Sequence, residues 1–433
     1  MTTDPMAIFI LIGGFVFLMA IKVPVAFALA LSAFASAWYF NPMFLRIVAQ
    51  QLIDGLRSFS LLAIPFFIIA GNLMGEGGIA RRLIDLADVC IGRVRGGLAM
   101  VNVMSSKFFG TVSGSVAADT SSLGTVLIPM MVKQGYDKNF AVANTVTSSI
   151  VGLLIPPSHN MIIFAMAAGG GVSIGALFLA GIVPALTLGI GLMIVTYIIA
   201  IKRNYPKGRA YSFREGAKIA LDSFLGLMTI VIIVGGITSG FFTATESSVI
   251  AVVYAFIITF FVYREIPLSH FKVVMKKSVR TVAMVMAIIS ASSAFGFMMT
   301  VLRVPDMVTS TMLQISDNPI VILLLINIIL LVLGLVMDMA PMILITTPIL
   351  LPVAQSVGMG PVQFGIVLLL NLGISLITPP VGTVLFIGCS IGKTKIESVI
   401  KPLLPYYAVM IIVLLMITFI PALSMWLPGV LLD

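Results

Sequence analysis

The chain has 433 residues, of which 60% are hydrophobic and 9% are charged, and its formal net charge is +9. A soluble domain carries about 25% charged residues, so this composition excludes a soluble globular fold and requires the bilayer as solvent. Lipid offers no water to backbone groups, and the sequence lacks the short alternating strands of a membrane barrel, so we expect an all-α polytopic membrane protein. Cys90 and Cys389 lie too far apart in the sequence to indicate a disulfide framework.

Apolar runs long enough to cross a bilayer, roughly 20 residues each, recur from Met6 to the end of the chain. They predict about 10 to 11 spanning segments and two re-entrant hairpins. In chain order the predicted elements are spans 6–21 and 23–40, an amphipathic surface helix 42–57, a span 59–75, a hairpin 96–131, a broken span 139–167, spans 175–201, 221–240, 245–263 and 281–302, a second hairpin 319–352, a broken span 362–391 and a last span 404–426.

Basic residues predict the orientation, because lysine and arginine gather on the cytoplasmic side of membrane proteins. Placing these clusters inside accounts for 21 of the 25 basic residues: Lys22, 81–95, 133–138, 202–218, 264–280 and 393–401. Both termini then lie outside. The same placement explains the positive net charge without a nucleic-acid partner.

The sequence contains an internal repeat at an offset of 223 residues. LIPMMVKQG at 127–135 faces LLPVAQSVG at 350–358, and LIPPSHNMIIF at 154–164 faces ITPPVGTVLFI at 377–387. The first hairpin starts from the inside and the second from the outside, so we expect two inverted copies, as in secondary transporters. The alternative is that membrane helices share prolines and glycines by chance.

The repeat divides the chain into four predicted regions. In chain order these are N-terminal scaffold helices at 1–75, a first repeat at 76–201 with hairpin 96–131 and broken helix 139–167, cytoplasmic linkers and scaffold spans at 202–280, and a second repeat at 281–433 with hairpin 319–352 and broken helix 362–391.

Each copy interrupts a spanning helix with two consecutive prolines, Pro156-Pro157 and Pro379-Pro380. Proline removes a backbone donor and clashes with the preceding turn, so we expect an unwound stretch at both places. The carbonyls freed at Ile155 and Thr378 would lie at membrane depth, where irregular backbone lines a cavity or is buried in protein. Such carbonyls and half-helix ends bind sodium in transporters, whereas the alternative is a simple kink that neighbouring helices satisfy.

The predicted hairpin tips carry ionisable residues. The first turn lies in the serine- and glycine-rich stretch 105–124, which contains Asp119, and the second lies in 334–342, which contains Asp338. An ionisable group inside the membrane costs at least roughly 2.5 kcal/mol unless it is compensated, and sodium would compensate an aspartate. Asp119 could instead pair with Lys107 across the hairpin, and Lys107 could instead attract a substrate carboxylate or extend to the cytoplasmic interface.

Three further motifs allow more than one interpretation. Thr243 and Glu246 have the spacing of a helix-start capping box, which alone explains them, although this segment could also face the centre of the protein. Ser158 and Asn160 follow the first Pro-Pro and are candidates for a cavity wall, whereas a structural role explains His159. GCSIGKT at 388–394 has three residues between its glycines where a nucleotide-binding loop needs four, so we do not expect ATP binding.

Three stretches carry a family resemblance: IPPSHNMIIF, GFFTATESSVIAVVYAF and LITPPVGTVLF. Over essentially its whole length the chain resembles the large membrane subunit of the tripartite ATP-independent periplasmic (TRAP) transporters. The resemblance implies sodium-coupled uptake of a carboxylate, of the sialic-acid or C4-dicarboxylate type, across a bacterial inner membrane. It also implies an elevator-type mechanism with scaffold and transport domains, and two partners, a small membrane subunit and a periplasmic binding protein.

The resemblance implies residue roles as well. The first sodium site would comprise Ser113, Ser115, Asp119, Gly152 and Pro157. The second sodium site would comprise Asp338, Thr378, Pro379, Gly382 and Thr383. Substrate contacts would come from Lys107, Ser158, Asn160 and Glu246.

Two other functions stay open at this point. A stand-alone ion-coupled antiporter or exporter would have the repeats without needing the partners. An intramembrane aspartyl protease would need Asp119 and Asp338 to share a proton, and it leaves the repeat and the Pro-Pro breaks unexplained. We therefore expect a transporter and not an enzyme, without ATP or nucleic acid among its ligands.

Overall fold

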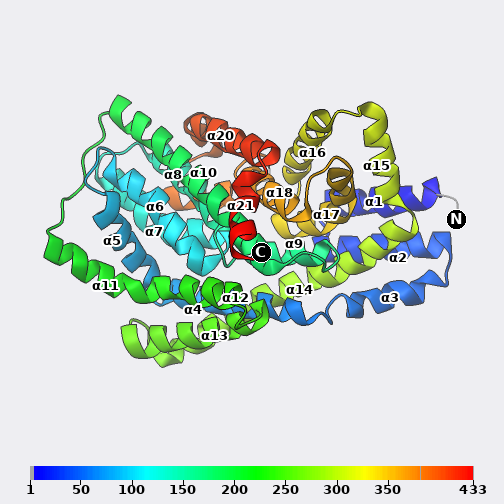
Figure 1. Ribbon diagram of the computed structural model, residues 1–433, viewed down its shortest axis with the longest axis horizontal. Coiled ribbons are helices and arrows are strands. Elements are labelled where there is room, and N and C mark those ends of the chain that lie inside the picture. Colours follow the sequence, from blue (N-terminus) through cyan, green and yellow to red (C-terminus); the bar gives the residue numbers. More distant parts are fainter. Residues whose placement is uncertain (1–3, 381, 433) are drawn as a thin grey trace.

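The computed structural model describes residues 4–380 and 382–432, and this part of the chain is helical apart from turns, loops and one isolated bridge between Arg95 and Lys207. The molecule is elongated, with α1, α2 and α3 towards one end and α5 and α11 towards the other (Figure 1). The first ten α-helices are α1 Pro5–Ala20, α2 Val25–Phe40, α3 Phe44–Asp54, α4 Ala63–Glu76, α5 Ile79–Ile91, α6 Gly97–Ser113, α7 Val116–Lys133, α8 Lys138–Leu154, α9 His159–Ala167 and α10 Ile174–Lys202. The others are α11 Phe213–Ile230, α12 Gly236–Thr238, α13 Ala244–Ile257, α14 Phe271–Val301, α15 Val304–Ile315, α16 Pro319–Gly334, α17 Met339–Ser356, α18 Pro361–Ser375, α19 Thr383–Gly392, α20 Ile396–Phe419 and α21 Ala422–Leu431. Short 3-10 turns span Phe59–Leu62 and Leu268–His270, and π-helical turns span Val231–Gly235 and Ile258–Tyr263.

Several helices begin at residues whose side chains accept their first N–H groups. Asp4 caps α1 and Asn318 caps α16, and in both helices a proline takes the first position, where its missing N–H is not needed. Thr243 and Glu246 form a reciprocal capping box at the start of α13, as the sequence predicts.

The helix bounds follow the offset of the sequence repeat. α17 starts 223 residues after the start of α7 and ends 223 residues after its end. Pro156-Pro157 separates α8 from α9, and Pro379-Pro380 separates α18 from α19, with both Pro-Pro peptide bonds cis. The helix breaks predicted from the double prolines are therefore present. The orientation of the two copies in a membrane stays a prediction.

Seven helices in the described residues are long and apolar enough to cross a bilayer, or eight when α8 and α9, which meet at 54°, are taken as one bent span. Six more apolar helices have only 10–17 residues, among them α1, α2, α16 and α18. A 16-residue helix is about 24 Å long, which is shorter than the roughly 30 Å hydrocarbon core. The prediction of about 10 to 11 spans was made by counting apolar runs. Turns and breaks inside several of these runs make their helices shorter than a full span.

The side chains pack in two hydrophobic clusters. The larger cluster joins both hairpins and both broken helices with α4, α10, α13 and α20. The smaller cluster joins α1, α2 and α3 with the second half of α14. α14 has 31 residues and contributes Val274 and Ile289 to the larger cluster and Phe295 and Met298 to the smaller one. This long helix therefore runs beside both groups of helices, while the domain boundaries stay predictions.

Candidate functional site

The turn between α6 and α7 consists of two residues, Gly114 and Ser115. Gly114 has φ = +57°, a left-handed conformation that glycine adopts without a steric penalty. The Ser115 hydroxyl accepts a hydrogen bond from the Ala118 N–H (3.4 Å) at the start of α7. The first hairpin therefore turns inside the predicted stretch 105–124.

This turn contacts the Pro-Pro break of the same repeat copy. A Cβ added to Gly114 would collide with the Pro157 carbonyl oxygen. Nearby, Gly110 of α6 lies against Gly152 of α8, and a Cβ on Gly152 would lie 3.1 Å from Asp119 Oδ2. The five residues predicted for the first sodium site thus lie on two segments in direct contact.

Asp119 lies in the first turn of α7 and is 1% exposed. The Ser106 hydroxyl donates a hydrogen bond to its Oδ1 (3.3 Å). Within the described residues Oδ2 accepts no hydrogen bond and no ion pair reaches the carboxylate, so the alternative pairing with Lys107 is not present. A buried carboxylate with one open oxygen is strongly unfavourable alone, and a bound cation would compensate it.

The second hairpin positions its aspartate differently. Asp338 precedes α17 and is exposed, and in residues 4–380 and 382–432 its carboxylate neither caps that helix nor hydrogen-bonds to Asp119. The proton-sharing pair that a protease would need is therefore not formed. The other four predicted residues of the second sodium site lie together at the break between α18 and α19: Thr378, Pro379, Gly382 and Thr383.

The Thr378 turn leaves one of its carbonyls close to a glycine. The Thr378 hydroxyl donates to the Ile374 carbonyl (2.8 Å), which closes the end of α18. A Cβ on Gly382 would lie only 3.0 Å from the Thr378 carbonyl oxygen. A side chain at position 382 would therefore crowd this carbonyl oxygen, and among the described residues Asp338 makes no hydrogen bond to the turn.

The four residues predicted to contact substrate lie in different surroundings. Ser158 and Asn160 are buried beside the first break, and the Ser158 hydroxyl has no hydrogen-bond partner among the described residues. Lys107 is half-buried on α6. Glu246 is exposed, and its Oε2 accepts a hydrogen bond from the Thr243 N–H (2.8 Å), so the capping box accounts for it.

A cavity of about 230 Å³ opens beside the tip of the first hairpin. We call it the inner cavity, because Lys277 in its lining belongs to the basic segment 264–280, which is predicted to lie on the cytoplasmic side. Its lining includes nine polar side chains from five helices and the hairpin turn: Asn72, Glu76, Ser113, Ser115, Ser121, Ser122, His159, Lys277 and Thr281. The cavity therefore adjoins the residues predicted for the first ion site.

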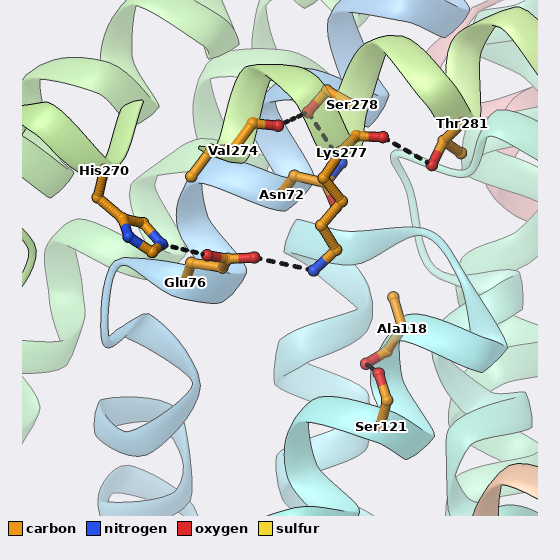
Figure 2. Close-up of polar contacts among 9 residues, drawn as sticks. All are labelled: Asn72, Glu76, Ala118, Ser121, His270, Val274, Lys277, Ser278 and Thr281. Atoms are coloured by element: carbon orange, nitrogen blue, oxygen red, sulfur yellow. Dashed lines mark hydrogen bonds and ion pairs between the residues drawn. The ribbon is translucent and has the colours of Figure 1, made fainter. Parts of the chain in front are cut away.

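Glu76 ends α4 and is held by two basic side chains (Figure 2). Lys277 Nζ donates to Glu76 Oε1 (2.9 Å), and His270 Nε2 lies 2.8 Å from Glu76 Oε2. One turn earlier on α4, Asn72 Nδ2 donates to the Ser278 hydroxyl (2.9 Å). These contacts join α4 to α14 along one side of the inner cavity.

Glu76 and Lys277 were not predicted to lie at a site. Lys277 belongs to the basic cluster 264–280, which predicts the orientation of the chain. A lysine among several other basic residues does not stand out as a binding residue. One signal was present, because Lys277 and Thr281 are four residues apart and therefore share a face of the helix.

Replacing Gly114 by alanine should separate the hairpin tip from the Pro-Pro break. The new Cβ meets the Pro157 carbonyl oxygen, which is backbone and moves only if the turn moves. We expect a drop in thermal stability and the loss of any stabilisation by sodium, because the two halves of the proposed ion site no longer meet. Thermal unfolding of the purified membrane complex with and without sodium measures both effects.

Gly135→Ala is the matched control. Gly135 also has a positive φ, +88°, but a Cβ there meets nothing within 4 Å. Both substitutions place alanine in a left-handed conformation, at about 1 kcal/mol. Equal sodium stabilisation in the two variants would show that the contact between Gly114 and Pro157 does not matter for ion binding.

Comparisons with known proteins agree on one family. Residues 12–423 match the family model described as tripartite ATP-independent periplasmic transporter, DctM component. The chain is 38% identical to the sialic acid TRAP transporter large permease protein SiaM of Vibrio cholerae, over 96% of this chain and 97% of that protein. It is also 38% identical to the C4-dicarboxylate TRAP transporter large permease protein DctM of Pseudomonas aeruginosa, over 93% of this chain and 94% of that protein.

The fold is similar to that in the crystal structure of the Alcanivorax borkumensis YdaH transporter, with a TM-score of 0.62 over 90% of each chain. At 15% identity this similarity concerns the fold alone. The family match, by contrast, covers nearly the whole chain, and the relatives are permeases and not enzymes. The chain belongs to the DctM family, the large membrane permeases of the tripartite ATP-independent periplasmic transporters.

Proposed function

We propose that this chain carries out sodium-coupled uptake of an organic acid. The observation that carries the proposal is the buried Asp119 carboxylate, whose Oδ2 faces Gly152 where the hairpin tip meets the Pro-Pro break. A cation bound there would neutralise the carboxylate, and the hydroxyl and carbonyl oxygens nearby are ligands that sodium accepts. We further propose a second ion site at the break after α18, which Asp338 would complete when the second hairpin tip closes over it.

The proposed substrate is a carboxylate of the sialic-acid or C4-dicarboxylate type. Its support comes from the two relatives, whose names specify these two substrates. The inner cavity fits this class, because it presents the ammonium of Lys277 and the hydroxyls of Ser113 and Ser115. A carboxylate accepts hydrogen bonds from both kinds of group.

The proposed transport cycle needs two partners and a moving unit. A small membrane subunit would widen the scaffold in the bacterial inner membrane, and a periplasmic binding protein would deliver the acid to the outer face. Both termini are proposed to be periplasmic. The hairpins and broken helices would move together against α4, α11 and α13 in an elevator-type motion, so that ion ligands from hairpin and break stay in contact.

The test is uptake into proteoliposomes that hold the chain with its small membrane subunit, with the binding protein added outside. Labelled succinate and N-acetylneuraminate are the probes. We expect uptake of at least one of them only under an inward sodium gradient, with potassium a poor substitute and ATP without effect.

Two outcomes would redirect the assignment. Undiminished uptake with sodium absent on both sides would refute sodium coupling. Full uptake without the binding protein would support the stand-alone antiporter, because such a protein binds its substrate from solution.

A further inference from the structure

We propose that Lys277 is the residue that binds the substrate carboxylate in the inner cavity, by exchanging its partner Glu76 for the substrate. This inference rests on the proposed uptake of an organic acid and names the residue that would recognise it. It assigns to Lys277 and Glu76 a shared role in releasing substrate towards the cytoplasm.

Lys277 is placed to reach the cavity. Its side chain is 58% exposed and extends from α14, with Glu76 on one side and the Ala118–Ser121 turn of α7 facing it on the other (Figure 2). An ammonium group with three donors that uses one of them on Glu76 has others available for a ligand. A carboxylate entering the cavity would therefore meet Lys277 as a preoriented cation.

Exchange of partners is feasible because Glu76 is held twice. When Lys277 Nζ leaves Oε1, Oε2 keeps its contact with His270 Nε2 at 2.8 Å. A half-buried carboxylate left without any partner would oppose the exchange, since losing the sole partner of a buried charge is strongly destabilising. Because His270 stays as a second partner, Glu76 can release Lys277 and bind it again.

The wall opposite Lys277 defines the ligand further. It is formed by hairpin serines that line the same cavity: Ser113, Ser115, Ser121 and Ser122. The Ser121 hydroxyl donates to the Ala118 carbonyl (3.1 Å), which leaves its oxygen free to accept a hydrogen bond from a ligand hydroxyl. The site therefore offers a carboxylate a cation at one end and serine hydroxyls at the other.

α14 lines the inner cavity and, further along the helix, a second cavity. Lys277, Thr281 and Val285 recur every four residues and line the inner cavity. Further along α14, Ile289 and Gly296 line an outer cavity of about 280 Å³ near the ends of α3 and α9. The two cavities share no lining residue, so Lys277 serves only the one that the basic residues place on the cytoplasmic side.

The experiment measures binding from the inside. Proteoliposomes are preloaded with increasing unlabelled succinate or N-acetylneuraminate, whichever the uptake assay transports, and sodium-driven uptake of the labelled acid is recorded. The binding protein is present only outside, so only complexes with the periplasmic face outward contribute. The internal concentration that halves uptake reports affinity at the inner cavity.

We expect Lys277→Met to raise this internal concentration about 10- to 100-fold, the range that a charge-assisted hydrogen bond supplies. Lys277→Arg should stay near the wild type, because the positive charge is kept. Glu76→Gln should lower the concentration, because Lys277 no longer has a competing counter-ion. The matched control is Lys276→Met, an exposed lysine one position earlier that does not line the cavity, and it should leave the concentration unchanged.

Two results would overturn the inference. Lys277→Met could behave as Lys276→Met does, or Glu76→Gln could weaken internal binding, which would make the ion pair a structural brace. Glu76→Gln keeps the test decisive if Lys277→Met does not assemble with its partner subunit, as size-exclusion chromatography would show. Absence of any sodium-driven uptake in the wild type would instead refute the proposed function, which separates the two failures.

Discussion

Replacing Asp119 by asparagine should lower sodium-driven uptake by at least about 100-fold, which corresponds to about 2.7 kcal/mol of lost ion binding. The carboxylate is buried, and its Oδ2 has no hydrogen-bond partner among the described residues. Its negative charge is therefore little screened and attracts a cation beside Gly152 strongly. At an effective dielectric of about 20, removing one unit charge next to a bound ion weakens the attraction by several kcal/mol. Uptake of the labelled acid in proteoliposomes measures the loss.

The same substitution should leave the protein folded, and that separates an ion site from a structural pair. Asparagine keeps the shape of the side chain and its contact with Ser106, and it removes a buried charge that is unfavourable without sodium. We expect sodium to raise the melting temperature of the wild-type complex and not that of Asp119→Asn, because a ligand stabilises only the state that binds it. Asp306→Asn, which changes an exposed aspartate on α15, should keep both uptake and the sodium shift. Normal sodium stabilisation in Asp119→Asn would exclude this carboxylate as an ion ligand.

Local chemistry made much of the fold predictable. Two consecutive prolines cannot continue a helix, so the breaks around Pro156 and Pro379 followed from the sequence, and the shared offset linked them. The serine- and glycine-rich stretch 105–124 predicted the first turn for the same kind of reason, and the turn lies within it at 114–115. Span counts were less predictable, because hydropathy shows that a run is apolar but not where its helix bends or ends.

The site was predictable only where a residue type was unusual for its surroundings. Asp119 stands out in an apolar segment, and the structure places it against Gly152. Asp338 is equally unusual in sequence, yet it is exposed, because burial depends on how the hairpin tip packs and not on its composition. Glu76 and Lys277 were not predictable as a pair, since 201 positions separate them and only the packing of α4 against α14 joins them.

Joining the first hairpin to α4 by a disulfide should stop transport completely. A Cβ on Gly71 of α4 would lie 3.4 Å from Ser113 Cα, so cysteines at these two positions are close enough for a disulfide. If the hairpin and its broken helix slide past α4 during each cycle, the covalent bond traps one state. In a Cys90→Ser/Cys389→Ala background, uptake by Gly71→Cys/Ser113→Cys should fall to that of empty liposomes after oxidation and return after reduction to the level of the Ser113→Cys single variant.

The control disulfide lies within the proposed moving unit. A Cβ on Gly124 of α7 would lie 3.3 Å from Thr145 Cγ2 of α8, so Gly124→Cys/Thr145→Cys joins the hairpin to a helix that should travel with it. Its oxidation should leave uptake unchanged, because the two helices keep their contact throughout the cycle. The single variants Gly71→Cys and Ser113→Cys show what each substitution does without the bond. Continued uptake with the Gly71–Ser113 bond fully formed would mean that α4 and the hairpin move as one body, and alternating access would then have to arise from motion elsewhere in the chain.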